Sequence, residues 1–136
     1  MRVLGIDYGD ARIGIALSDE LEILASPLQT YKSQSMRKDI DYVASVAKEN
    51  NCGKIVIGLP LNMNGTEGAR VEKTKAFGKV LEKVAGLPVV YKDERLTTVQ
   101  VERVFDQANV KKDKRKQIVD KTAAVLILQS YLDTKN

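Results

Sequence analysis

The stretch MRVLGIDYGDARIGIALSDE, residues 1–20, contains two short runs with the pattern of β-strands, joined by a turn. Apolar residues dominate residues 3–7 and alternate with smaller ones over residues 12–18, and Gly9 between the runs suits a tight turn. The first run ends in an acid, Asp7. An ionised carboxylate at the end of a buried strand must be hydrated, paired or bound to a cation, because isolation in an apolar setting is costly. The stretch therefore predicts a β-hairpin and marks Asp7 as a candidate functional residue.

Beyond the hairpin, changes in hydrophobic period predict the remaining elements. A third strand is expected over residues 23–31, and Pro27 within it favours the edge of a sheet. The other expected elements are a helix over residues 36–50 capped by Ser33 or Ser35, a strand over 54–58, a helix over 67–85, a strand over 89–91, and helices over 97–109 and 113–133. This order predicts an α/β fold with a mixed five-stranded sheet, in which the first three strands are antiparallel and the later ones run parallel to the first.

Composition excludes several classes of protein. The chain has 136 residues, 43% of them apolar and 29% charged, which is ordinary for one globular domain. A single cysteine, Cys52, and the lack of histidine argue against a disulfide framework and a zinc site. The longest apolar stretch, residues 55–61, is too short to span a membrane. We therefore expect a cytoplasmic protein. Its net charge of +4 favours polyanionic partners such as nucleic acid.

Three carboxylates stand where the surrounding pattern predicts other residue types. Asp7 ends the first strand, Glu94 follows the strand at residues 89–91, and Asp120 heads an otherwise core-facing row of the last helix. That row continues with Ala123, Ala124, Ile127 and Tyr131, and a second apolar row comprises Ile118, Val125, Leu128 and Leu132. The carboxyl ends of parallel strands share one edge of a sheet, where ligands bind. A last helix packed across that edge would bring the three acids together.

Such a cluster needs a positive charge to relieve its self-repulsion. Carboxylates with water and substrate phosphates are the usual ligands of Mg²⁺, and the lack of histidine favours Mg²⁺ or Mn²⁺ over zinc. Metal ions held in this way activate water and stabilise the leaving oxygen in phosphodiester hydrolysis. The residues favour a nuclease in which Asp7, Glu94 and Asp120 are catalytic metal ligands. A capping or turn role for each acid taken singly is the alternative.

Asp93 competes with Glu94 for this role. Side chains alternate along a strand, so the two acids are expected on opposite faces and only one of them can join Asp7. Glu94 is preferred because its additional methylene helps it to span an intervening strand.

Basic residues supply candidate contacts to phosphate. Lys112, Lys114, Arg115 and Lys116 lie just before Asp120 and would bring a nucleic-acid backbone to the metal site, although a solvated helix start has the same composition. Arg12 and Arg95 are further candidates, and a polar loop with Asn62, Asn64 and Gly65 is expected at the same edge. For these residues a surface turn or an ion pair is the alternative.

Four ordered motifs carry a family resemblance over nearly the whole chain. GIDYGDARIGIALSD, IVIGLPLNMNGTEG, KDERLTT and DKTAAVLILQSYL resemble the successive motifs of the YqgF family, also called RuvX. The resemblance implies one ribonuclease H-like nuclease domain over residues 1–136, related to the resolvase RuvC and dependent on a divalent metal. It also implies processing of the 5′ end of the 16S ribosomal RNA precursor, or resolution of Holliday junctions, and matches Asp7, Glu94 and Asp120 to the family's acids.

One departure and two rivals accompany this assignment. Many ribonuclease H-like enzymes place their second acid on the strand after the first helix, but here that strand ends Gly58-Leu59-Pro60. A strand-Asp-x-Gly-turn-strand also begins actin-like ATPases and sugar kinases, which bind nucleotide between two such domains, whereas 136 residues supply one. A nucleic-acid-binding module with idle acids is the other rival. The sequence leaves open RNA or branched DNA as substrate, the number of metal ions, and monomer or homodimer.

Overall fold

The computed structural model describes residues 1–60, 68–93 and 112–134, and for residues 112–122 it describes the backbone only. Its elements are β1 (Arg2–Tyr8), β2 (Arg12–Ser18), β3 (Ala25–Lys32), α1 (Met36–Glu49), β4 (Cys52–Leu59), α2 (Ala69–Ala85), β5 (Val89–Asp93) and α4 (Lys112–Thr134). These elements confirm the order expected from the sequence. The helix expected over residues 97–109 lies outside the described residues.

The strands form one mixed sheet in the order β3-β2-β1-β4-β5. The pairs β1–β2 and β2–β3 are antiparallel, and β1–β4 and β4–β5 are parallel, as predicted. Pro27 lies in the edge strand β3. This strand begins two residues later than predicted because the Asp19 carboxylate accepts hydrogen bonds from the backbone N–H groups of Ile23 and Leu24, at 2.7 and 3.0 Å, and holds them in a loop.

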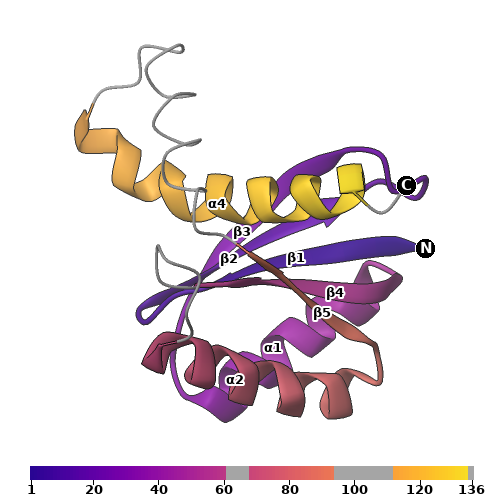
Figure 1. Ribbon diagram of the computed structural model, residues 1–136, viewed down its shortest axis with the longest axis horizontal. Coiled ribbons are helices and arrows are strands. Elements are labelled where there is room, and N and C mark those ends of the chain that lie inside the picture. The colour runs from indigo at the N-terminus through magenta and orange to yellow at the C-terminus, as the bar shows by residue number, and fades with distance from the viewer. Residues whose placement is uncertain (61–67, 94–111, 135–136) are drawn as a thin grey trace.

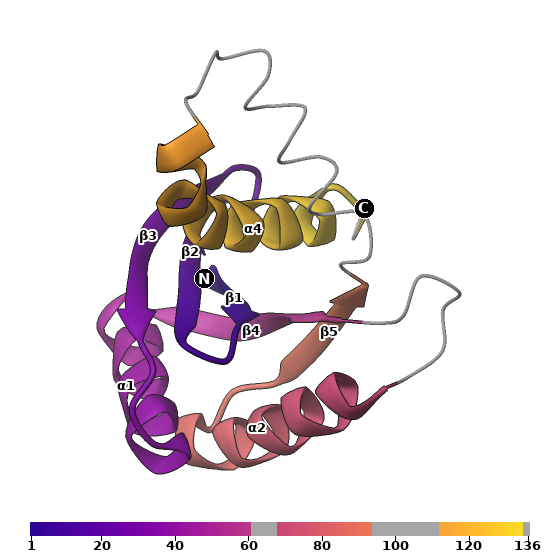
Figure 2. The same ribbon diagram turned by 90° about the vertical axis from the view of Figure 1, so that its left-hand side faces the viewer.

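Helices cover both faces of the sheet and make three layers (Figure 1). Helices α1 and α2 lie on one face and α4 on the other, which Figure 2 shows from the side. Strand alternation divides the core accordingly. Residues buried on the α1/α2 face include Leu4, Ile6, Tyr8, Ile13, Ile15, Ile55, Ile57, Phe77 and Leu81. Residues buried on the α4 face include Val3, Ala16, Val56, Ala124, Ile127, Leu128 and Leu132.

Local hydrogen bonds set the start of helix α1. The Ser35 side chain accepts from the Lys38 N–H at 3.2 Å, so Ser35 is the N-cap, one of the two residues predicted. Ser33 instead donates to the carboxylate of Asp39, which is buried and also accepts from the Gln34 N–H at 2.9 Å. The start of α1 is therefore tied to the end of β3.

Helix α4 lies very close to β1. A β-carbon on Gly5 would be 2.6 Å from the β-carbon of Leu128 and 3.2 Å from the carbonyl oxygen of Ala124, so only glycine fits there. Both predicted rows of α4 contribute buried residues, since a helix this close to the sheet buries a wide stripe. None of the helices within the described ranges has the length and apolar character of a membrane span.

Candidate active site

Asp7 lies on the α4 face of β1, near the carboxyl end of the strand. It has the same parity as Val3 and Gly5, which pack against α4, and its side chain is half-buried. Its partner on β2 is Gly14. On β4, Ile57 pairs with Ile6, so the residue beside Asp7 is Gly58. The carboxylate therefore stands between two positions that have no side chain.

The same row continues outward on both sides. Thr30 pairs with Gly14, and Lys92 pairs with Gly58, so the row reads Thr30, Gly14, Asp7, Gly58, Lys92; we call it the Asp7 row. The Thr30 hydroxyl is buried and has no hydrogen-bond partner within the part of the chain that the structure describes. The Lys92 ammonium donates to the Thr134 hydroxyl of α4 at 3.3 Å, which confirms that this row faces α4.

Two cations lie next to the Asp7 row. Arg12, predicted to contact phosphate, begins β2 two residues before Gly14 and is exposed. It pairs directly with Lys32, the last residue of β3, which is also exposed. Two cations thus lie directly opposite each other on neighbouring strands, next to the Asp7 row. Sequence reasoning missed Lys32 because it ended the third strand at residue 31.

The structure assigns Asp93 to the other face. Asp93 ends β5, is exposed and has the parity of Tyr91, whose ring packs against Gly78 of α2. By alternation Asp93 therefore belongs to the α2 face, opposite to that of Asp7. Glu94, Arg95 and the loop with Asn62, Asn64 and Gly65 lie outside the described residues.

The remaining predicted residues lie in α4. Asp120 is four residues before Ala124 along the helix, and Lys112, Lys114, Arg115 and Lys116 occur within its first five positions. This end of α4 lies toward the β1–β2 turn in Figure 1. No group of three acids, cysteines or histidines that could hold a metal occurs in the part of the chain that the structure describes. Glu94 and the side chain of Asp120 fall outside that part.

The chemistry of the Asp7 row fits a hard divalent cation. The Asp7 carboxylate supplies oxygen donors, and the chain has no imidazole. Oxygen donors of this kind bind Mg²⁺ or Mn²⁺ in preference to softer metals. The chain's one thiol, Cys52, is buried on the α1/α2 face and takes no part in this row.

Solved structures with similar folds include RuvC and a viral Holliday junction resolvase. T. thermophilus RuvC in complex with a Holliday junction superposes with a TM-score of 0.59 at 18% identity, over 99% of this chain and 95% of that one. The fowlpox virus resolvase bound to Holliday junction DNA gives 0.59 at 14% identity, over 99% of both chains. The fold is thus that of the ribonuclease H-like class that contains the RuvC-like resolvases.

Sequence comparison narrows this class to one family. The family model RuvX, described as Holliday junction resolvase, matches residues 1–134. A protein of Streptococcus thermophilus named "Putative pre-16S rRNA nuclease" is 48% identical over 136 residues, which cover 98% of each chain. The chain belongs to the RuvX family.

Proposed function

We propose that this chain is a divalent-metal-dependent nuclease with Asp7 at its catalytic centre. The family and its relatives are named for cleavage of nucleic acids. The observation that carries the proposal is the position of Asp7. A half-buried carboxylate lies between two glycines on the α4 face, at the sheet edge where α/β proteins bind ligands.

The packing of α4 on β1 supports Asp120 as a second ligand. Gly5 of β1 lies against Ala124. From Gly5 to Asp7 the strand advances about 6.6 Å, at about 3.3 Å per residue. From Ala124 back to Asp120 the helix advances about 6 Å, at about 1.5 Å per residue. Strand β1 and helix α4 run in opposite directions in Figure 1, so these two steps of similar length lead toward the same end of the sheet. They bring the backbone of Asp120 about level with Asp7.

Strand parity supports Glu94 as the third ligand. Lys92 belongs to the Asp7 row, and the next position of the same parity is 94. Strand β4 lies between β1 and β5, so a ligand from β5 must reach past Gly58, which has no side chain to obstruct it. The departure from other ribonuclease H-like enzymes, which have an acid where this chain has Gly58-Leu59-Pro60, thus fits a longer acid that follows β5 in the sequence.

The three acids would hold Mg²⁺ or Mn²⁺, which when bound activates water and stabilises charge on the leaving oxygen. The chain's own residues hold the nucleic acid in place. Arg12 and Lys32 bind a backbone phosphate beside the Asp7 row. Arg95 and the first turns of α4, with Lys112, Lys114, Arg115 and Lys116, attract the polyanion over a longer range.

The substrate we propose is the 5′ end of the 16S ribosomal RNA precursor, processed in the cytoplasm by a chain whose residues 1–136 form one domain. The name of the Streptococcus thermophilus relative supports this assignment. Branched DNA is the second candidate, because the family is described as Holliday junction resolvase and the superposed RuvC is bound to such a junction. Symmetric cleavage of a four-way junction needs a dimer, whereas trimming one RNA end does not.

A panel of substrates tests the proposal. The purified protein is incubated with Mg²⁺ or Mn²⁺ and, in parallel, with precursor RNA extended at its 5′ end, single-stranded RNA of the same length, and four-way-junction DNA. We expect cleavage of the precursor RNA that stops on addition of EDTA. Cleavage of the junction alone would select the second candidate. The absence of metal-dependent cleavage of all three would contradict the proposal.

The neighbouring acids Asp93 and Glu94 provide a matched pair of variants. Glu94→Gln should remove metal-dependent cleavage, since it replaces a proposed ligand. Asp93→Asn changes charge equally but alters the α2 face, so it should retain most of the activity. The reverse result would show that Asp93 is the ligand, and normal cleavage by both variants would exclude this strand from the site.

A further inference from the structure

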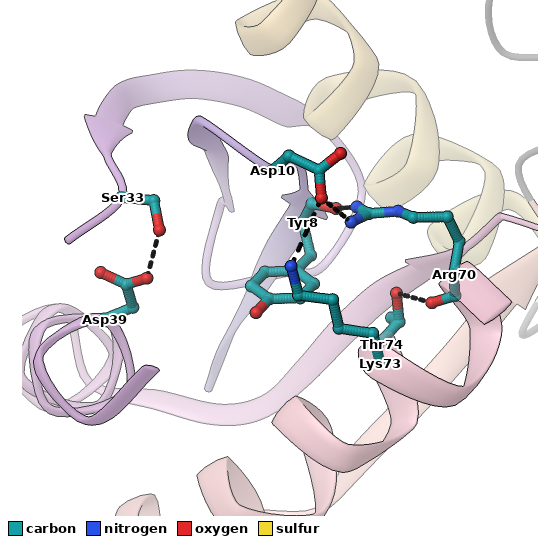
Figure 3. Close-up of polar contacts among 7 residues, drawn as sticks. All are labelled: Tyr8, Asp10, Ser33, Asp39, Arg70, Lys73 and Thr74. Carbon is teal, nitrogen blue, oxygen red and sulfur yellow. Dashed lines mark hydrogen bonds and ion pairs between the residues drawn. The ribbon is translucent and has the colours of Figure 1, made fainter. Parts of the chain in front are cut away.

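A second cationic cluster lies on the opposite side of the β1–β2 turn from the Asp7 row. Arg70 and Lys73 stand one turn apart at the start of α2, and both contact one oxygen of the Asp10 carboxylate (Figure 3). The Lys73 ammonium is 3.4 Å from Oδ1 of Asp10. Two cations thus share one anion, and the cluster keeps a net positive charge.

Arg70 is held in a defined position. Its guanidinium donates to the carbonyl oxygen of Tyr8 as well as to Asp10, and lies 5.7 Å from the centre of the Tyr8 ring. That ring is buried and stacks on Phe77, with ring centres 4.1 Å apart. The guanidinium therefore rests on a rigid part of the core.

Asp10, in contrast, is at the surface. Its side chain is 75% exposed, and it lies in the turn closed by the hydrogen bond from Gly9 N–H to the Arg12 carbonyl, at 2.9 Å. Exposed ion pairs of this kind contribute little to stability. A group that contributes little to stability can be displaced by a stronger anion at small cost.

We infer that Arg70 and Lys73 form a second phosphate site, and that Asp10 occupies it in the free protein and is displaced by the nucleic-acid backbone. This inference rests on the proposed nuclease function. A planar guanidinium paired with an ammonium suits the several oxygens of a phosphate, which a carboxylate matches only in part. The site binds a phosphate that flanks the cleaved one, and Asp10 lowers affinity for short or non-specific polyanions.

The position of the Arg70–Lys73 pair allows one nucleic-acid strand to contact this pair and the Asp7 row together. Tyr8, the anchor of Arg70, directly follows Asp7 in β1, but the two side chains point to opposite faces. The Asp7 row lies on the α4 side of the β1–β2 turn, and the Arg70–Lys73 pair lies on its α2 side. A nucleic-acid strand that crosses the turn contacts both.

Binding of a fluorescein-labelled single-stranded RNA, measured by anisotropy in EDTA over a range of salt concentrations, tests the inference. Lys73→Gln should weaken binding about two- to fivefold and make the salt dependence shallower by up to about 0.7 log units, as expected when one cation no longer binds phosphate. Lys79→Gln is the matched control, since it removes one charge from an exposed position of the same helix. It should bind as the wild type does.

Asp10→Asn distinguishes a displaced anion from a structural ion pair. If Asp10 competes with phosphate, this variant binds the RNA about two- to fivefold more tightly than the wild type. Unchanged or weaker binding by Asp10→Asn, or equal binding by Lys73→Gln and Lys79→Gln, would overturn the inference. These results leave the nuclease function intact if the wild type cleaves RNA. A wild type that neither binds nor cleaves RNA overturns both.

Discussion

The two faces of the sheet are built from the same strands but differ sharply in side-chain size. The α1/α2 face buries large apolar residues, among them Leu4, Ile6, Ile13, Ile15 and Ile57. On the α4 face the intervening positions of β1, β2 and β4 include Gly5, Asp7, Gly14, Ala16 and Gly58. The α1/α2 face therefore supplies most of the apolar burial. The α4 face buries less apolar surface, but its small residues allow close helix packing and it carries polar groups.

This difference separates stability from chemistry. A fully buried large apolar side chain stabilises the fold by about 1.5–3 kcal/mol, and the α1/α2 face contains most of them. The α4 face carries the half-buried carboxylate of Asp7 and the hydroxyl of Thr30, which is buried without a partner among the described residues and so does not favour folding. Substitutions on the two faces should therefore affect different measurements.

The largest effect is expected on the α4 face, from Asp7→Asn. Loss of this carboxylate should reduce cleavage by about a hundredfold or more, as when a group that stabilises transition-state charge is removed. The melting temperature should be equal to that of the wild type or higher, because carboxylate repulsion is relieved. Asp41→Asn, on an exposed position of α1, is the control and should cleave normally. Wild-type cleavage by Asp7→Asn would remove Asp7 from the mechanism.

On the opposite face, Phe77→Ala should act on stability. Phe77 is fully buried and stacks on Tyr8, so its truncation should lower the free energy of unfolding by about 3–5 kcal/mol. Val80→Ala, on the exposed side of α2, should change it by no more than about 0.5 kcal/mol. Urea denaturation measures both. A small effect of Phe77→Ala on the free energy of unfolding would contradict the assignment of stability to the α1/α2 face.

The basic start of α4 provides a smaller test. Replacing Lys112, Lys114, Arg115 and Lys116 by serine removes up to four cations that bind phosphate, so RNA affinity should fall. Its salt dependence should become shallower by about 0.7 log units for each phosphate that is no longer neutralised. Stability should change little. An unchanged salt dependence would show that these residues form a solvated surface.

The smallest effect concerns pH and the core of the α1/α2 face. Burial raises the pKa of the Cys52 thiol from 9.0 to about 11. Between pH 9.0 and about 11 the Cys52 thiol is deprotonated in the unfolded chain and protonated in the folded protein. The free energy of unfolding therefore decreases as pH rises through this range. The loss is about 1.4 kcal/mol per unit of pKa difference at most. Cys52→Ala should show a shallower decrease over this range, and equal slopes would contradict the assignment.

The fold followed from the sequence because its patterns are local. Alternation in residues 12–18, the edge proline Pro27 and the helical period after Met36 each predict an element that the structure confirms. Errors occurred at boundaries. The start of β3 depends on the side chain of Asp19, which accepts hydrogen bonds from Ile23 and Leu24. Hydrophobic periodicity does not reveal such hydrogen bonds.

The candidate site was predictable only in part. Asp7 stood out because an acid interrupts an apolar run, and strand alternation assigns Asp93 to the face opposite Asp7. Thr30 was missed because its place in the Asp7 row depends on the register of β2 with β3, which shifts between Ile15 and Ala16. Lys32 was missed because the predicted strand ended at residue 31. The contact of Arg70 with Asp10, residues 60 positions apart in the chain, depends on how α2 packs against the turn.

Direct measurement of metal binding tests the central claim, that Asp7 is a metal ligand on the α4 face. Mn²⁺ is titrated by calorimetry into the wild type, Asp7→Asn and Asp41→Asn, each shown to be folded by thermal denaturation. We predict that the wild type and Asp41→Asn bind Mn²⁺ with the same affinity and that Asp7→Asn loses binding. Equal Mn²⁺ affinity of all three proteins, or no binding by the wild type, would contradict the account.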